Sequence, residues 1–189
     1  MSVKPPSAYG LLSELSRVKE GSKPPIDQWN PALRYPIEMN INSRGEWFYE
    51  GSMIARPRLV RLFASVLKRI DADYYLVTPA EACQITVADA PFIGIGLECV
   101  GAADAQVLTL STNVGDEVEI SAEHPLSFRE NEGALIPYVS IRQGLAAKLN
   151  RSTYYELMQL LVESNTAPDR FGIWSHGAFF EVSDNDADC

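Results

Sequence analysis

The clearest concentration of positive charge in this sequence lies between residues 56 and 69. This stretch has no acidic residue, although the whole chain carries a formal net charge of −9. Its basic residues are Arg56, Arg58, Arg61, Lys68 and Arg69. On a helix, the last four fall on one arc opposite an apolar stripe. Two interpretations stay open: a solvated helix face, or a surface that binds an anion or an acidic partner.

Two arginines are placed at the predicted beginnings of helices. Arg56 precedes Pro57, and proline is common at the first helical position. Arg151 has the comparable position before a second helical pattern. Backbone N–H groups and the helix dipole favour negative charge at such a place. The pair therefore favours anion binding at helix N-termini.

A second group of polar side chains lies within a short span of predicted turns and consists of Asn113, Asp116, Glu117, Glu123 and His124. Such groups could bind a ligand or exchange protons. The alternative is ordinary turn chemistry, since Asn, Gly and Asp are common in turns. Dinucleotide-binding, phosphate-loop, serine-hydrolase and zinc-protease motifs do not occur. We therefore expect a non-catalytic protein without a cofactor, with an unrecognised hydrolase using His124 and Asp116 as an alternative.

Composition limits the class of protein further. With 46% hydrophobic and 22% charged residues, the chain can bury a core without disulfides or a structural metal. Three separated cysteines and two histidines argue against a disulfide framework and a multi-histidine metal site. The negative net charge argues against general nucleic-acid binding. No signal peptide or membrane span is evident, so we expect a soluble, cytoplasmic protein.

Hydrophobic periodicity predicts the elements that position these side chains. Helices are expected at 8–18, 57–70 and 151–164, the last with Thr153 and Glu156 in capping-box spacing. A hairpin is expected around the turn at 42–45, and another around His176-Gly177. Further strands are predicted at 74–79, 83–87, 92–100, 107–111, 117–120 and 135–141.

These elements predict an α+β fold of two small domains, residues 1–85 and 86–189. The second domain is expected to be β-rich with one long helix. Arg44-Gly45 turns a hairpin that leads to the Pro57 helix, and 142–144 turns one that leads to the Arg151 helix. We interpret this as a duplicated hairpin-helix-strand unit. The interface between two such domains is a favoured place for a ligand.

Several short motifs together resemble the bacterial domain-of-unknown-function family 1285, over about residues 26–182. They are R-G-E-W-F-Y-E-G, R-P-R-L-V-R-L-F, Y-Y-L-V-T-P, D-A-P-F, T-N-V-G-D-E-V, E-H-P-L, P-Y-V-S-I-R, L-N-R-S-T-Y-Y and W-S-H-G-A-F-F. The resemblance implies a two-domain fold with internal duplication and a C-terminal domain loosely like a pleckstrin-homology barrel. It also implies a nucleotide-like ligand between the domains and a role in signalling.

The polar motif residues that this resemblance marks are Arg44, Arg56, Asn113, Asp116, His124, Arg142, Asn150 and Arg151. Their first interpretation is a site for an anionic small molecule at the interdomain groove, in a regulatory protein. Their second is structural, because buried polar groups need partners and could tie the domains together. A protein-protein adaptor that presents the basic helix face to an acidic partner is the other alternative.

Overall fold

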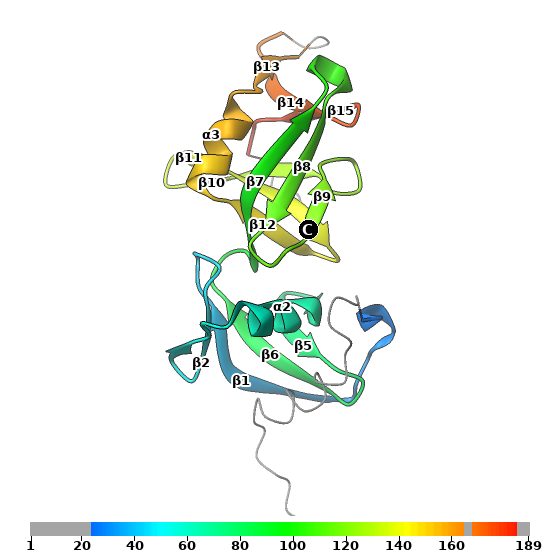
Figure 1. Ribbon diagram of the computed structural model, residues 1–189, viewed down its shortest axis with the longest axis vertical. Helices are drawn as coiled ribbons and strands as arrows, with labels where there is room; N and C mark the ends of the chain where they lie inside the picture. Colours follow the sequence, from blue (N-terminus) through cyan, green and yellow to red (C-terminus); the bar gives the residue numbers. More distant parts are fainter. Residues whose placement is uncertain (1–23, 165–167, 185–189) are drawn as a thin grey trace, which may run out of the picture. The chain divides into compact units, whose positions relative to one another are not determined.

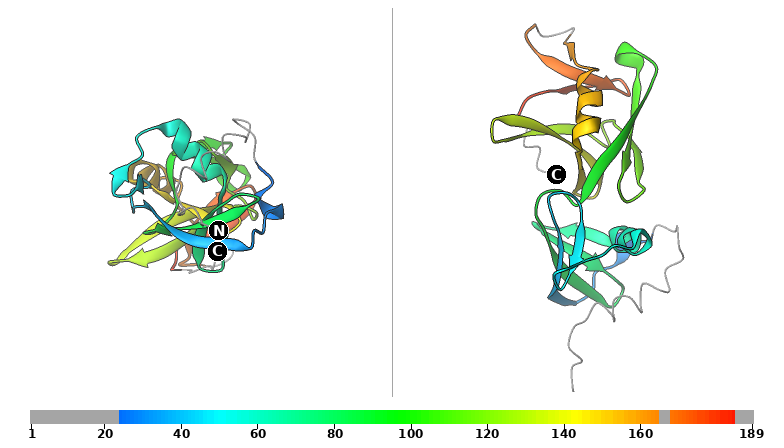
Figure 2. Two further views of the ribbon diagram at one scale, coloured as in Figure 1. Left: turned by 90° about the horizontal axis from the view of Figure 1, so that it is seen from below. Right: turned by 60° about the vertical axis from the view of Figure 1, so that its left-hand side comes forward.

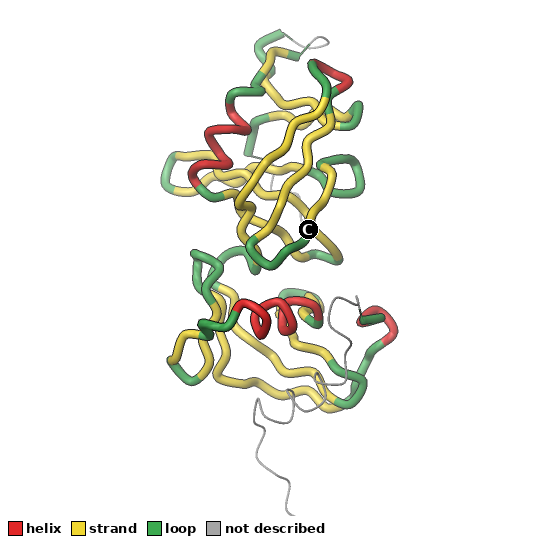
Figure 3. Tube along the Cα trace, viewed as in Figure 1, coloured by secondary structure: helices red, strands yellow, loops and turns green. Residues whose placement is uncertain are grey.

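The computed structural model describes residues 24–164 and 168–184, and divides into two units between Asp89 and Ala90 (Figure 1). Within these residues the fold is mostly β-sheet, with two α-helices, α2 and α3 (Figure 3). The helix predicted at 8–18 lies outside the described residues. In the described part of the chain, no helix is long and apolar enough to cross a membrane.

Unit 1 is built on a six-stranded sheet with the order β3-β2-β1-β6-β5-β4. Its strands are β1 (Leu33–Ile41), β2 (Trp47–Tyr49), β3 (Ser52–Met53), β4 (Leu67–Ile70), β5 (Asp73–Val77) and β6 (Glu81–Val87). Neighbouring strands are antiparallel, except that the central pair β1 and β6 is parallel. A short 3-10 helix, η1 (Ile26–Gln28), precedes the sheet. The hairpin predicted around residues 42–45 is confirmed as β1–β2.

Helix α2 (Pro57–Ser65) supplies apolar side chains to the core of unit 1. Phe63 is 2% exposed and stacks on Trp47, which is 1% exposed, with ring centroids 6.2 Å apart. Large buried aromatic side chains such as these dominate the packing energy of a small core. The apolar spacing from Leu59 onward therefore identified the buried side of this helix correctly.

The predicted extension of this helix to residue 70 is wrong. The helix ends at Ser65, and β4 pairs with β5 in the register Leu67↔Leu76. Val66 and Leu67 are both fully buried. Their apolar side chains fit the helical spacing, although they lie at the start of the β4–β5 hairpin. Asp71, at φ 55°, forms the turn between the two strands. The hairpin places these apolar residues in the core and completes one edge of the sheet.

This change of element also divides the predicted basic helix face. Arg58 and Arg61 lie on α2, whereas Lys68 and Arg69 lie on β4. The Lys68 ammonium lies 3.3 Å from the carbonyl oxygen of Ile26 and bonds to the η1 turn. The Arg69 guanidinium lies 6.0 Å from the ring centroid of Tyr74. The five basic residues therefore do not form one helical surface.

Unit 2 contains a second six-stranded sheet, with the order β10-β11-β12-β7-β8-β9. Its strands are β7 (Phe92–Val100), β8 (Val107–Thr112), β9 (Glu117–Glu119), β10 (Leu126–Asn131), β11 (Ala134–Arg142) and β12 (Leu145–Leu149). A 3-10 turn, η2 (Ala103–Ala105), separates β7 from β8. The four strands predicted in this region are confirmed, and so is the hairpin turned at residues 142–144, which is β11–β12. β10 was not predicted.

The two sheets have the same strand order when each is counted from its own first strand. In both, the first and last strands pair in parallel at the centre. The hairpins that the predicted repeat equates occupy different positions, however. β1–β2 are the first two strands of unit 1, and β11–β12 are the last two of the sheet in unit 2.

Helix α3 (Arg151–Met158) follows β12 and lies against β7 (Figure 2). The predicted continuation to Ser164 is wrong, because β13 (Val162–Glu163) pairs instead with β14 (Phe171–Ser175). β15 (Ala178–Glu181) completes this three-stranded sheet. The β14–β15 turn at His176-Gly177 is confirmed, with φ of 51° and 74°. The N-cap residue of α3 is Asn150, whose side chain accepts a hydrogen bond from the Thr153 backbone N–H. The capping-box spacing had indicated Thr153 as the N-cap, which is wrong.

Candidate functional site

Arg142, the last residue of β11, has both a carboxylate and an aromatic ring as side-chain partners. Its guanidinium donates a charge-assisted hydrogen bond to Asp116 and lies 4.9 Å from the ring centroid of Phe92. The side chains of Arg142 and Asp116 are 23% and 18% exposed. The arginine is thus held by a carboxylate and an aromatic face while part of it still reaches solvent.

The order of the sheet brings these three residues together from distant parts of unit 2. Phe92 begins β7, and Asp116 lies in the turn between β8 and β9. That turn is closed by hydrogen bonds from the Asp116 N–H to Thr112 Oγ1 and from the Thr112 N–H to the Asp116 carbonyl oxygen. Gly115 has a φ of 90°, a conformation that favours glycine. The Asp116 carboxylate is therefore positioned by a well-defined turn.

Asn113 fastens the same turn to β7. Its side-chain oxygen accepts a hydrogen bond of 2.9 Å from the Ile93 N–H, and its own N–H donates to the Ile93 carbonyl oxygen. These bonds fix the turn beside Phe92. We call Phe92, Asn113, Asp116 and Arg142 the Arg142 cluster.

His124 has a different partner. Its Nδ1 lies 3.1 Å from the carbonyl oxygen of Ser140, two residues before Arg142 on β11. Asp116, the other residue of the hydrolase alternative, is paired with Arg142. Within the described residues, no group of three or more His, Cys, Asp or Glu side chains is placed to hold a metal ion.

Asn150 and Arg151 lie at the beginning of α3. The Asn150 side-chain oxygen accepts hydrogen bonds from the Thr153 N–H at 2.9 Å and the Ser152 hydroxyl at 2.8 Å. This is helix capping, which stabilises the free N–H groups of the first turn. Arg151 is exposed, with its guanidinium 5.7 Å from the ring centroid of Tyr155. The predicted place of Arg151 at a helix N-terminus is confirmed.

Arg56 occupies the N-cap position of α2 in unit 1 and is exposed. Its side chain makes no capping hydrogen bond, and the first turn of α2 contains no acidic residue. The predicted position of Arg56 at the start of a helix is therefore confirmed as well.

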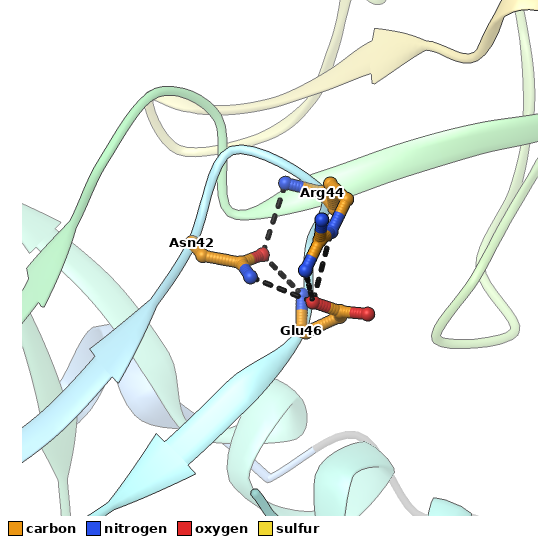
Figure 4. Close-up of polar contacts among 3 residues, drawn as sticks. All are labelled: Asn42, Arg44 and Glu46. Carbon is orange, nitrogen blue, oxygen red and sulfur yellow. Dashed lines mark hydrogen bonds and ion pairs between the residues drawn. The ribbon is translucent and has the colours of Figure 1, made fainter. Parts of the chain in front are cut away.

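Arg44 belongs to the β1–β2 turn of unit 1 (Figure 4). Its Nη2 lies 2.8 Å from Glu46 Oε2, and the Asn42 side-chain nitrogen donates to the same oxygen at 2.7 Å. The Asn42 side-chain oxygen accepts the N–H groups of Arg44 and Glu46. The Arg44 side chain is 76% exposed, so this small network serves the turn at the surface.

The Glu46 carboxyl should titrate below the ordinary range for glutamate. Hydrogen bonds from Asn42, and secondarily from Arg44, stabilise the ionised form and lower its pKa. Because the folded pKa is lowered, the stabilisation is complete above the unfolded pKa and is lost as pH falls through the folded one. A carbon-detected NMR titration should show Asn42→Ala raising the Glu46 pKa more than Arg44→Gln does. Identical titrations in wild type and Asn42→Ala would contradict this.

The structure thus brings together three of the predicted residues, Asn113, Asp116 and Arg142. His124 and Arg151, also in unit 2, have other partners. The Asn150 N–H donates to the Gly94 carbonyl oxygen of β7. Arg44 and Arg56 belong to unit 1. Phe92 was not among the predicted site residues. A buried aromatic residue at the beginning of a strand is usually a core residue, and its position in the D-A-P-F motif was the available signal.

Comparisons with known proteins agree for both units. Residues 24–90 match the family described as "Domain of unknown function (DUF1285), N-terminal domain". Residues 91–182 match "Protein of unknown function (DUF1285), C-terminal domain". None of the curated proteins matches this chain.

Two crystal structures are similar to it. A DUF1285 family protein from Silicibacter pomeroyi DSS-3 is 39% identical with a TM-score of 0.85, covering 93% of this chain and 95% of that one. A DUF1285 family protein from Shewanella baltica OS155 is 28% identical with a TM-score of 0.52, covering 65% of this chain and 91% of that one.

Proposed function

We propose that this chain, which belongs to the DUF1285 family, is a non-catalytic regulatory protein that binds a small phosphate-bearing anion such as a nucleotide. The proposed site is the Arg142 cluster at the strand ends of unit 2. Three members of this cluster, Asn113, Asp116 and Arg142, are also site residues predicted from the sequence. A role in signalling is part of the proposal, since reversible binding of a nucleotide-like molecule is a common regulatory input.

The observation that supports this site is the restraint on Arg142. The Phe92 ring and Asp116 hold its guanidinium in one orientation, and the side chain is 23% exposed. A guanidinium that is already ordered loses less conformational entropy when a ligand binds. Its planar N–H donors match the oxygens of a phosphate group and form charge-assisted hydrogen bonds with it.

The fold is also consistent with the regulatory class. The common strand order of the two sheets supports the proposed internal duplication, with a six-stranded sheet in place of the predicted hairpin-helix-strand unit as the repeated part. In unit 2 the helix α3 follows the last strand of the sheet, which supports the proposed likeness to a pleckstrin-homology barrel. Ligand groups are commonly found on loops and at strand ends of a rigid scaffold, and the Arg142 cluster lies at such a place.

Arg142→Gln should abolish the binding of pyrophosphate and nucleotides, measured by calorimetry and by ligand-induced thermal stabilisation. The guanidinium supplies the charge, and glutamine cannot replace it. The matched control is Arg170→Gln, which removes another arginine of unit 2 paired with a carboxylate, Glu181 at 3.3 Å. This control should bind as the wild type does.

Two results would contradict the proposal. One is equal binding by Arg142→Gln and wild type, which would place the ligand elsewhere. The other is the absence of any thermal shift in wild type across nucleotides, phosphorylated metabolites and pyrophosphate, because a bound ligand stabilises the native state.

A further inference from the structure

The Arg142 guanidinium, to which the proposed ligand would bind, already forms an ion pair with the Asp116 carboxylate. We infer that Asp116 is a selectivity residue of this site, which admits multiply charged phosphates and excludes carboxylate metabolites. This inference rests on the proposed function of the Arg142 cluster. It explains why an anion site would contain Asp116, whose negative charge opposes the binding of an anion.

The competition follows from the geometry. Asp116 is held next to Arg142 by its own turn, through hydrogen bonds with Thr112 on both its N–H and its carbonyl oxygen. A tethered group competes at a high effective concentration because it never diffuses away. A ligand must therefore interact more favourably with the Arg142 guanidinium than the Asp116 carboxylate does.

Carboxylates and phosphates differ in this respect. Each carboxylate group of a ligand carries the same single charge as Asp116, so its exchange for Asp116 at the guanidinium would gain no favourable interaction. A phosphate group carries about 1.5 to 2 negative charges near neutral pH and has three strong acceptor oxygens. It can bond to the guanidinium while Asp116 moves aside or shares it, and a diphosphate carries more charge still.

The burial of the pair makes the discrimination stronger. Both side chains are less than a quarter exposed, at 23% for Arg142 and 18% for Asp116. Charge interactions between partly buried groups are larger than in bulk water and are less screened by salt. An anion that approaches Arg142 must therefore displace or share an ion pair that solvent and salt screen only in part.

The test compares pyrophosphate with malonate, a dicarboxylate, by calorimetry on the full chain. Wild type should bind pyrophosphate and show no heat of binding with malonate. Asp116→Asn should bind pyrophosphate about tenfold more tightly, and malonate should now bind measurably. Glu117→Gln is the matched control, because it removes one negative charge from the adjacent, exposed residue. It should leave both affinities within about twofold of wild type, as expected for a solvent-screened charge.

The outcomes separate this inference from the proposed function. If wild type binds pyrophosphate through Arg142 but Asp116→Asn gains neither affinity nor malonate binding, the selectivity role is overturned and the site stands. If neither wild type nor Asp116→Asn binds pyrophosphate, both fail. Circular dichroism establishes that the variant is folded, and Asp116→Ser takes its place in the same comparison if the asparagine variant is not.

Discussion

Replacing Phe92 by alanine is expected to lower the free energy of unfolding of unit 2 by about 4 kcal/mol and to abolish anion binding. Phe92 is fully buried, so its removal loses the transfer energy of a ring and leaves a cavity. It also removes the aromatic face beneath the Arg142 guanidinium. Native-state hydrogen exchange of the β7 and β8 amides measures the first effect, and calorimetry with pyrophosphate measures the second.

Phe92→Leu separates the two contributions of this residue. Leucine keeps most of the buried apolar volume, so the loss of stability should be less than half of that in the alanine variant. It lacks the π-face on which the guanidinium lies, so pyrophosphate binding should still weaken. Wild-type affinity in the leucine variant would show that the ring does not orient Arg142.

Ser175→Ala is expected to destabilise unit 2 by about 3 kcal/mol. The Ser175 hydroxyl is fully buried, donates to the Ile120 carbonyl oxygen at 2.6 Å and accepts from the Leu108 N–H at 3.0 Å. It thereby connects β14 to β8 and to the end of the β9 segment. Alanine would leave a buried donor and a buried acceptor without this partner, and each of them carries a desolvation cost.

Exchange of the Leu108 amide reports on this bond directly and should become faster in Ser175→Ala. Ser121→Ala is the matched control, since the Ser121 hydroxyl accepts a hydrogen bond from an exposed backbone N–H. Its effect should stay within about 0.5 kcal/mol, as is usual for a surface substitution. Equal stability of the two variants would contradict a structural role for the Ser175 bonds.

Strands with regular alternation and clear turn residues could be predicted from sequence. β7 was predicted with its observed bounds, and the hairpins at residues 42–45 and His176-Gly177 were found because glycine marks their turns. β12 was implied by the hairpin predicted around residues 142–144 but was given no bounds of its own, for a physical reason. Its sequence, L-A-A-K-L, has low strand propensity and forms a strand because it pairs with β7 at the centre of the sheet.

The two helices show the limit of apolar spacing. Val66, Leu67 and Ile70 continue a helical pattern after Ser65, yet the chain turns there and β4 pairs with β5. A short apolar run is compatible with either element, and long-range pairing decides between them. The same ambiguity extended the second predicted helix beyond Met158 into β13.

The sequence identified which residues belong to the candidate site, but it did not identify the contacts between them. Asn113, Asp116 and Arg142 were identified as polar motif residues, but the pairing of Arg142 with Asp116 joins residues 26 positions apart. No local pattern encodes such a contact, since it arises from the order of the strands in the sheet. Arg44 shows the converse, because Asn42 and Glu46, its partners, lie within two residues of it.

The most direct test of the account is an NMR titration of the full chain with pyrophosphate, following the Arg142 side-chain Nε–H signal and the backbone amides. We expect the largest shifts at Arg142, at residues 113–116 and at the beginning of β7, with saturation at one ligand per chain. Shifts confined to other surfaces, or an Arg142 signal that does not change while ligand binds, would contradict an anion site at the Arg142 cluster.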